Sequence, residues 1–249
     1  MDIPTPTVEL QELGISIVAS DFRPQMLNLD VLKFSGIIPQ DWELAQSPKM
    51  TTALMQLSFS NGVNLIAQPR QIALLQATPI PPDTANPEIP QIAQQYLEQF
   101  PKADYQSLSL APKVLLGFPE HPEAAREFIT GQLLAEGTWQ QLGHAPLQAN
   151  VTLNYQLKRC PLTIAISAVQ LKQNEQQIPA LLFAGTFNYS IPEVYRDRRA
   201  AYLSKRISKW PTDLVQFSEV VHRKFFSTPS NSSSRPAATS VFPDLEASQ

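Results

Sequence analysis

The chain has 249 residues, of which 43% are hydrophobic and 16% charged, a composition typical of a globular protein with a substantial core. Its net charge of −3 gives no general attraction to nucleic acids or anionic lipids. A single cysteine excludes an internal disulfide framework and a cysteine-rich metal site. We expect a cytoplasmic protein without a membrane span, because the sequence opens on no secretory signal and contains no long apolar run.

The first hundred residues alternate between strand-like and helix-like patterns. Residues 7–19 end in an apolar alternation that predicts a strand, and 22–36 predict a short, poorly capped helix or turn. Five prolines in 78–91 predict a stiff connector. The segment 91–100 then places its apolar residues on one face, which predicts a helix.

A three-stranded meander is predicted between the short helix and the proline-rich connector. Apolar alternation runs through 51–77 and is interrupted by Asn61 and Gly62, a pair that favours a tight hairpin turn because both residues tolerate a positive φ. A second turn is expected at 68–70, before the last strand of the meander.

The second half repeats this order of elements. Residues 105–118 predict a strand and 121–134 a helix that begins at a proline. Three long strands are expected within 150–191, with turns near residues 159–161 and 174–177. Two helices follow, one up to residue 210 and one after the proline at 211.

Two tryptophan segments mark equivalent places in the two halves. Trp42 and Trp139 are each followed by a leucine, a proline and a strand-like segment. We interpret both as structural joints at the start of a meander, where a tryptophan packs its ring over the end of a sheet. Each half then reads strand, helix, three strands, helix. The predicted fold is α+β, in which duplicated halves form one pseudo-twofold antiparallel sheet with helices on one face.

The predicted division is a first half over 1–101, a second half over 102–226 and a disordered tail over 227–249. The tail is rich in Ser, Pro and Ala, which cannot form a core. In topology alone, the order of elements resembles the duplicated saddle of the TATA-binding protein. Likeness of topology does not carry function.

Part of the sequence is also similar to a known family. The runs "LNLDVLKFSGIIPQDWELAQSP" and "FSNGVNLIAQP" look like an uncharacterised family of cyanobacterial proteins. The similarity extends over residues 25–75 and 90–190. It implies no activity and no site residues.

The sequence offers no motif for catalysis. None of the three histidines has a partner at metal-ligand spacing, and no phosphate-binding loop, nucleotide fingerprint or nucleophile motif is present. Cys160 follows Lys158 and Arg159, whose charges lower a thiol pKa, but a basic hairpin turn explains this stretch more simply. We therefore predict no catalytic residue, no cofactor and no metal, and favour a protein that is not an enzyme.

The segment 193–210 is the strongest charge feature, with six cations, two acids and interleaved aromatic residues. It is interpreted either as a docking surface for an acidic partner or as a solvated helix face. Under the first interpretation the partner-binding residues are exposed cations of this segment: Arg198, Arg199, Lys205 and Arg206.

The C-terminal stretch "SVFPDLEAS" places two large apolar residues, Phe242 and Leu245, beside acids. Such a cluster on a flexible tether is similar to a short linear binding motif, and the alternative is an inert tail.

Three functions remain open. The favoured one is a binding, assembly or adaptor protein that acts through contacts with a protein partner. An enzyme or small-ligand protein with a pocket between sheet and helices is an alternative, which a buried cluster of titratable groups would favour. A nucleic-acid binder is the other alternative and is disfavoured by the acidic remainder of the chain. The identity of the partner and the oligomeric state stay open.

Overall fold

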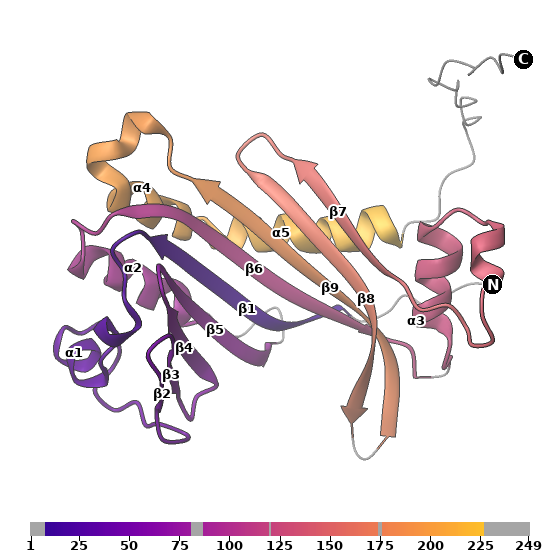
Figure 1. Cartoon of the computed structure of the whole chain (residues 1–249), viewed down its shortest axis with the longest axis horizontal. Helices are drawn as coiled ribbons and strands as arrows, with labels where there is room; N and C mark the ends of the chain where they lie inside the picture. Colours follow the sequence, from indigo (N-terminus) through magenta and orange to yellow (C-terminus); the bar gives the residue numbers. More distant parts are fainter. Residues whose placement is uncertain (1–7, 81–86, 120, 174–175, 227–249) are drawn as a thin grey trace, which may run out of the picture.

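One antiparallel sheet organises the chain (Figure 1). The computed structural model describes residues 8–80, 87–119, 121–173 and 176–226. In this part of the chain the sheet has nine strands in the order β2-β3-β4-β5-β1-β6-β9-β8-β7. The strands are β1 Val8–Ala19, β2 Lys49–Met50, β3 Met55–Ser58, β4 Val63–Gln68, β5 Gln71–Ile80, β6 Tyr105–Gly117, β7 Asn150–Gln156, β8 Pro161–Gln173 and β9 Gln176–Ser190.

Short helices connect and cover these strands. The α-helices are α1 Leu29–Phe34, α2 Ile89–Gln99, α3 Ala124–Glu127, α4 Arg199–Ile207 and α5 Trp210–Val220. The 3-10 helices are η1 Pro24–Met26, η3 Thr138–Gln141 and η4 Glu193–Arg198, and the π-helices are η2 Phe128–Leu133 and η5 Val221–Phe225. The fold is α+β, as the sequence predicts.

The core lies on one face of the sheet because apolar residues alternate along the strands. Ile15 of β1 pairs with Leu74 of β5 on one side and with Leu110 of β6 on the other. Cross-strand pairing extends this row of buried side chains over seven strands: Leu57, Leu65, Leu74, Ile15, Leu110, Phe187 and Leu162. A row of this kind stabilises the sheet through neighbouring side chains that are all removed from water.

Helices pack over this apolar row. α2 contacts β1, β5 and α4, while α4 and α5 contact β6. In the view of Figure 1, α5 passes behind the strands of the second half. Its Phe217 lies against Gly185 of β9 so closely that a Cβ at that glycine would be 2.5 Å from Cε2 of the ring. The glycine therefore makes room for the aromatic ring that joins α5 to the sheet.

The predicted hairpin at Asn61 and Gly62 is confirmed, since β3 and β4 pair with Ser58 opposite Asn64. Of the two turn residues Asn61 and Gly62, only Gly62 has a positive φ, at 85°. The turn between β4 and β5 contains a positive φ at Arg70, whose backbone N–H donates to the carbonyl oxygen of Phe22. That bond ties the turn to the loop after β1.

Helix α1 differs from its prediction, because it is capped. The side-chain oxygen of Asn28 accepts hydrogen bonds from the backbone N–H groups of Asp30 and Val31, at 2.8 and 3.4 Å. Asparagine is a favoured residue at this position because its short side chain reaches the free N–H groups of the first turn. The prediction of a poorly capped segment is therefore wrong.

The two tryptophans lie before their meanders but in different surroundings. Trp42 is partly buried and packs edge-on against Phe59, with the ring centroids 5.0 Å apart. Trp139 lies in η3 and is 48% exposed. The packing role is thus seen for Trp42, and the equivalence of the two joints stays a prediction.

The boundary predicted after residue 101 falls between the end of α2 and the start of β6. The predicted tail, 227–249, lies outside the described residues. Within the described ranges, no helix is long and apolar enough to cross a membrane.

Candidate functional site

The basic segment 193–210 forms η4, α4 and the start of α5 at one end of the sheet. Apolar residues at helical spacing, Ala200, Leu203 and Ile207, are buried on the inner side of α4. This anchoring leaves the remaining sides of the helix for its cations. The predicted partner-binding residues divide into two that are held by contacts within the protein and two that are exposed.

Arg199 is one of the two held cations. One of its guanidinium nitrogens, Nη1, lies 2.5 Å from Oδ1 of Asp104 and donates to the carbonyl oxygen of Tyr105 at 2.7 Å. The Arg199 side chain is only 23% exposed. It therefore fixes the start of α4 to the first residues of β6.

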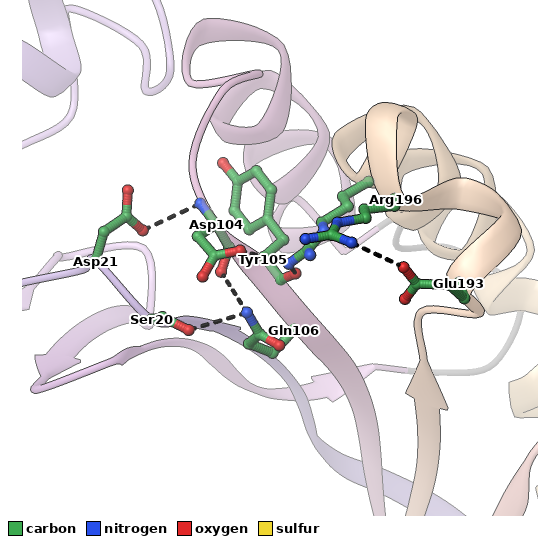
Figure 2. Close-up of polar contacts among 8 residues, drawn as sticks. Ser20, Asp21, Asp104, Tyr105, Gln106, Glu193 and Arg196 are labelled. Atoms are coloured by element: carbon green, nitrogen blue, oxygen red, sulfur yellow. Dashed lines mark hydrogen bonds and ion pairs between the residues drawn. The ribbon is translucent and has the colours of Figure 1, made fainter.

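The same joint also holds the end of β1. Figure 2 shows the backbone N–H of Asp104 directed at Asp21, a hydrogen bond of 3.1 Å to Oδ1. It also shows the side chain of Gln106 bridging to Ser20, where Nε2 donates to the hydroxyl oxygen at 2.9 Å. These bonds, together with Arg199, connect β1, β6 and α4 at one corner of the molecule.

Arg206 is the second held cation and is surrounded by tyrosines. Its guanidinium carbon lies 4.8 Å from the ring centroid of Tyr202 and 5.6 Å from that of Tyr189. The ring of Tyr195 lies next to Tyr202, with centroids 4.6 Å apart. Such contacts stabilise a cation above the negative face of an aromatic ring. The expectation that all four predicted residues are exposed is thus wrong for Arg199 and Arg206, which are partly buried.

Arg198 and Lys205 are exposed, as expected, and so is Lys209 at the end of the segment. Among the described residues, none of these three side chains has a hydrogen bond or an ion pair. Arg196 is exposed as well and pairs with Glu193 across 3.2 Å, as drawn in Figure 2. An exposed pair of this kind is weak. We call Arg196, Arg198, Lys205 and Lys209 the basic surface.

A groove of about 520 Å³ runs between α2 and α4 beside the basic surface. Its α4 wall consists mainly of small residues, and Lys205 lies on this wall. Glu98 lies on the α2 wall, so the two sides carry opposite charges. The amide of Gln94 connects the walls, because its Nε2 donates to the carbonyl oxygen of Ser204 at 3.4 Å.

A buried polar network lies elsewhere, where the turn between β7 and β8 meets α5. Asp213 is 1% exposed, and its Oδ1 lies 2.5 Å from Nη2 of Arg159. Its Oδ2 accepts a hydrogen bond of 2.6 Å from the hydroxyl of Tyr189. Arg159 also donates to the side chain of Gln216. Burial raises the pKa of the Asp213 carboxyl, although the Tyr189 bond and the Arg159 charge act in the opposite direction.

Cys160 adjoins this network and is buried. Burial raises the pKa of its thiol, which outweighs the lowering that neighbouring cations produce. The lowering of the thiol pKa that Lys158 and Arg159 suggest in the sequence is therefore wrong. The interpretation of this stretch as a hairpin turn agrees with the position of Cys160 between β7 and β8. A protonated, buried thiol is a poor nucleophile.

This network is a buried cluster of titratable groups, the feature that would favour an enzyme or a small-ligand protein. The pockets beside α2, α3 and α4 are lined by other residues. Throughout the described ranges, no group of three or more His, Cys, Asp or Glu side chains could hold a metal ion. The three histidines, His121, His144 and His222, are exposed.

Sequence reasoning missed Asp213 and Tyr189 as partners. Asp213 follows a proline in the first turn of a helix, a position where exposed acids are common. Tyr189 belongs to the alternation of β9 and reads as an ordinary core residue. Phe242 and Leu245, the two predicted tail residues, lie outside the described residues.

Comparison of the chain with protein-family models and with curated proteins gave no match.

Proposed function

We propose that the protein is a non-catalytic binding or adaptor protein that docks an acidic segment of a protein partner on the basic surface. The observation that supports this proposal is the division of the cations of 193–210. Arg199 and Arg206 are engaged within the protein, whereas Arg198, Lys205 and Lys209 are exposed with no ion pair among the described residues. Exposed cations gathered on one segment attract a partner of opposite charge and set its orientation.

The groove between α2 and α4 restricts the shape of the segment that can bind there. An extended segment fits a groove with small residues on its α4 wall, and Lys205 draws acidic side chains toward α4. Glu98 on the α2 wall repels them, so the segment is expected to place its acids on one side only. A nucleic acid, which is charged along its whole length, is less well suited to such a groove.

The test uses a labelled peptide with acids at alternate positions and an oligonucleotide of equal charge. The triple variant Arg198→Glu, Lys205→Glu, Lys209→Glu is expected to bind the peptide roughly tenfold more weakly or worse, because attraction becomes repulsion. Its unfolding free energy should change by less than about 1 kcal/mol, since exposed charges contribute little to stability. Binding is measured by fluorescence anisotropy at several salt concentrations.

A matched control reverses three exposed cations elsewhere: Arg23, Lys49 and Lys158. Its net charge equals that of the first variant, and it should bind the peptide like the wild type. Equal losses in both variants would show only an effect of total charge. Tighter binding of the oligonucleotide than of the peptide would indicate that the partner is a nucleic acid and not a protein.

We infer that the tail adds a second contact through Phe242 and Leu245. Two large apolar side chains buried in a partner could contribute roughly 3–5 kcal/mol before ordering costs. A chain that ends at Ser227 should keep the thermal midpoint of the full chain and bind an authentic partner more weakly. A lower thermal midpoint would instead mean that the tail packs on the core.

We also propose that the two halves are duplicates of one unit. In support, β1 and β6 begin their halves and lie side by side at the centre of the sheet. The three meander strands then follow outward in matching order, β5-β4-β3 beside β1 and β9-β8-β7 beside β6. The helices that follow the two meanders, α2 and α4, contact each other.

A further inference from the structure

The two edges of the sheet are protected to different degrees. At one edge, β2 has only two residues, includes Lys49 and follows Pro48. At the other edge, β7 has seven residues, "NVTLNYQ", with no charge and no proline. Proteins usually keep an edge strand from pairing with another chain by making it short or by adding charge or proline. β7 has none of these devices.

Within the described residues, the outer side of β7 has no backbone hydrogen-bond partner. Its inner side pairs with β8 over its whole length, from Asn150 opposite Ser167 to Gln156 opposite Pro161. It is the last strand of the sheet, and no other described strand pairs with it (Figure 1). Alternate residues of an edge strand leave their N–H and C=O groups directed outward, ready for a further strand.

The apolar row of the core reaches β7, where its side chains are only partly buried or exposed. Val151, Leu153 and Tyr155 lie on the core face of β7, opposite buried residues of β8. Tyr155, which continues the row beyond Leu162, is 39% exposed. A strand added at this edge would cover the half-exposed apolar side chains and satisfy the backbone groups together.

We propose that β7 pairs antiparallel with β7 of a second copy of this chain, across a twofold axis at Leu153. The sequence is self-complementary in this register. On the core face, Leu153 meets its own copy and Val151 meets Tyr155, while on the open face Thr152 meets Asn154 and Asn150 meets Gln156. Pairs between β-branched and aromatic residues and between polar side chains stabilise antiparallel strands.

The proposal explains why an uncharged strand is tolerated at the edge. A twofold pair is closed, because each copy uses its one open edge and the far edges are the short β2 strands. The two sheets would continue into one through backbone hydrogen bonds. This pairing does not involve the basic surface, so it can fail or succeed independently of the proposed function.

The first test places charges at Thr152 and Asn154, which oppose each other across the axis. In the full chain, Thr152→Lys with Asn154→Lys sets like charges opposite each other twice and should weaken the dimer roughly tenfold or more. Thr152→Lys with Asn154→Glu sets opposite charges at the same positions and should keep it. Sedimentation over a wide range of protein concentration measures the association of the wild type and both variants.

Both variants replace the Asn154 amide, whose oxygen accepts a hydrogen bond from the Thr163 hydroxyl, so the stability of each folded monomer is measured as well. Circular dichroism verifies that both are folded. A wild type that is monomeric at every concentration overturns the proposal. So does a dimer that both variants form equally well.

The second test fixes the register. Thr152→Cys and Asn154→Cys are made as separate variants, and the native Cys160 is buried in both. Under mild oxidation, a mixture of the two should form an intermolecular disulfide much faster than either variant alone, because the two introduced cysteines face each other only in a dimer that contains one copy of each variant. Equal rates in the mixture and the separate samples overturn the twofold register.

Discussion

At the scale of single residues, Tyr189 and Asp213 show how a polar group is kept inside the core. The Tyr189 hydroxyl donates to Oδ2 of the buried Asp213 carboxyl at 2.6 Å. Tyr189→Phe removes this donor and leaves a buried acceptor without it, so we expect a loss of about 1–3 kcal/mol in unfolding free energy. Denaturant unfolding measures it.

Tyr155→Phe is the matched control for this change. Tyr155 lies at the edge of the sheet and is 39% exposed, so loss of its hydroxyl should change the unfolding free energy by less than about 0.5 kcal/mol. Equal effects of the two substitutions would mean that the Tyr189 hydroxyl contributes nothing specific to the network.

The same carboxyl predicts a dependence of stability on pH. Burial raises the pKa of Asp213 above the ordinary 3.8, so the folded state keeps a proton that the unfolded state has already lost. The contribution of Asp213 to stability therefore falls as pH rises above about 4, until the folded state also loses the proton. The thermal midpoint of the wild type minus that of Asp213→Asn should decrease across this window. An increase would mean that Arg159 and Tyr189 outweigh burial.

The residues of the site could be predicted only in part from the sequence. The charge of 193–210 identifies the segment, because charge is a property of composition. Which cations are exposed depends on distant partners. Arg199 meets Asp104, which lies 95 residues earlier in the chain, and Arg206 meets Tyr189 of β9 as well as Tyr202 on its own helix. No local pattern contains the contact of Arg199 with Asp104 or that of Arg206 with Tyr189.

At the scale of elements, the packing of α5 depends on one close approach between a ring and a glycine. Gly185→Ala places a Cβ about 2.5 Å from Cε2 of Phe217, which the ring can relieve only by shifting. We expect a loss of about 1–3 kcal/mol in unfolding free energy from this overpacking. Phe217→Leu removes the opposing ring. In the Phe217→Leu background, Gly185→Ala should therefore lower the unfolding free energy by less than it does in the wild type. A double variant with purely additive losses would contradict the contact.

Elements that depend on neighbouring residues agree best with the predictions from sequence. The hairpin at Gly62, the helix α2 and the three long strands of the second half follow from local turn chemistry and apolar spacing. The N-terminal cap of helix α1 is not predicted, because the capping role of Asn28 depends on backbone angles that its sequence context does not determine.

At the scale of the whole molecule, the sheet joins the two predicted halves through the pairing of β1 with β6. The sequence predicts an antiparallel sheet shared by two halves, but the order of its strands depends on pairing between residues far apart in the chain, such as Ile15 and Leu110. Local propensity does not specify such partners. The observed order places the first strand of each half at the centre, where it is covered on both sides by neighbouring strands.

We expect this central pairing to make the two predicted halves dependent on each other. Separated after residue 101, each half would expose the long edge of β1 or β6 and the core residues that α2 and α4 cover together. We expect residues 1–101 and 102–226 to be unfolded or aggregated alone and to regain the circular dichroism spectrum of the intact chain when refolded together. Sedimentation should then show a one-to-one complex.

Cleavage of the folded chain is the control for this experiment. A protease site inserted between residues 101 and 102, in the turn after α2, cuts the chain without removing any strand pairing. The two pieces should stay associated after cleavage, because the β1–β6 bonds and the buried row around Ile15 and Leu110 remain in place. If both halves, each studied alone, unfold cooperatively as monomers, each half contains a complete core of its own. The sheet would then join two independent domains, and its central pair would contribute little to the stability of either.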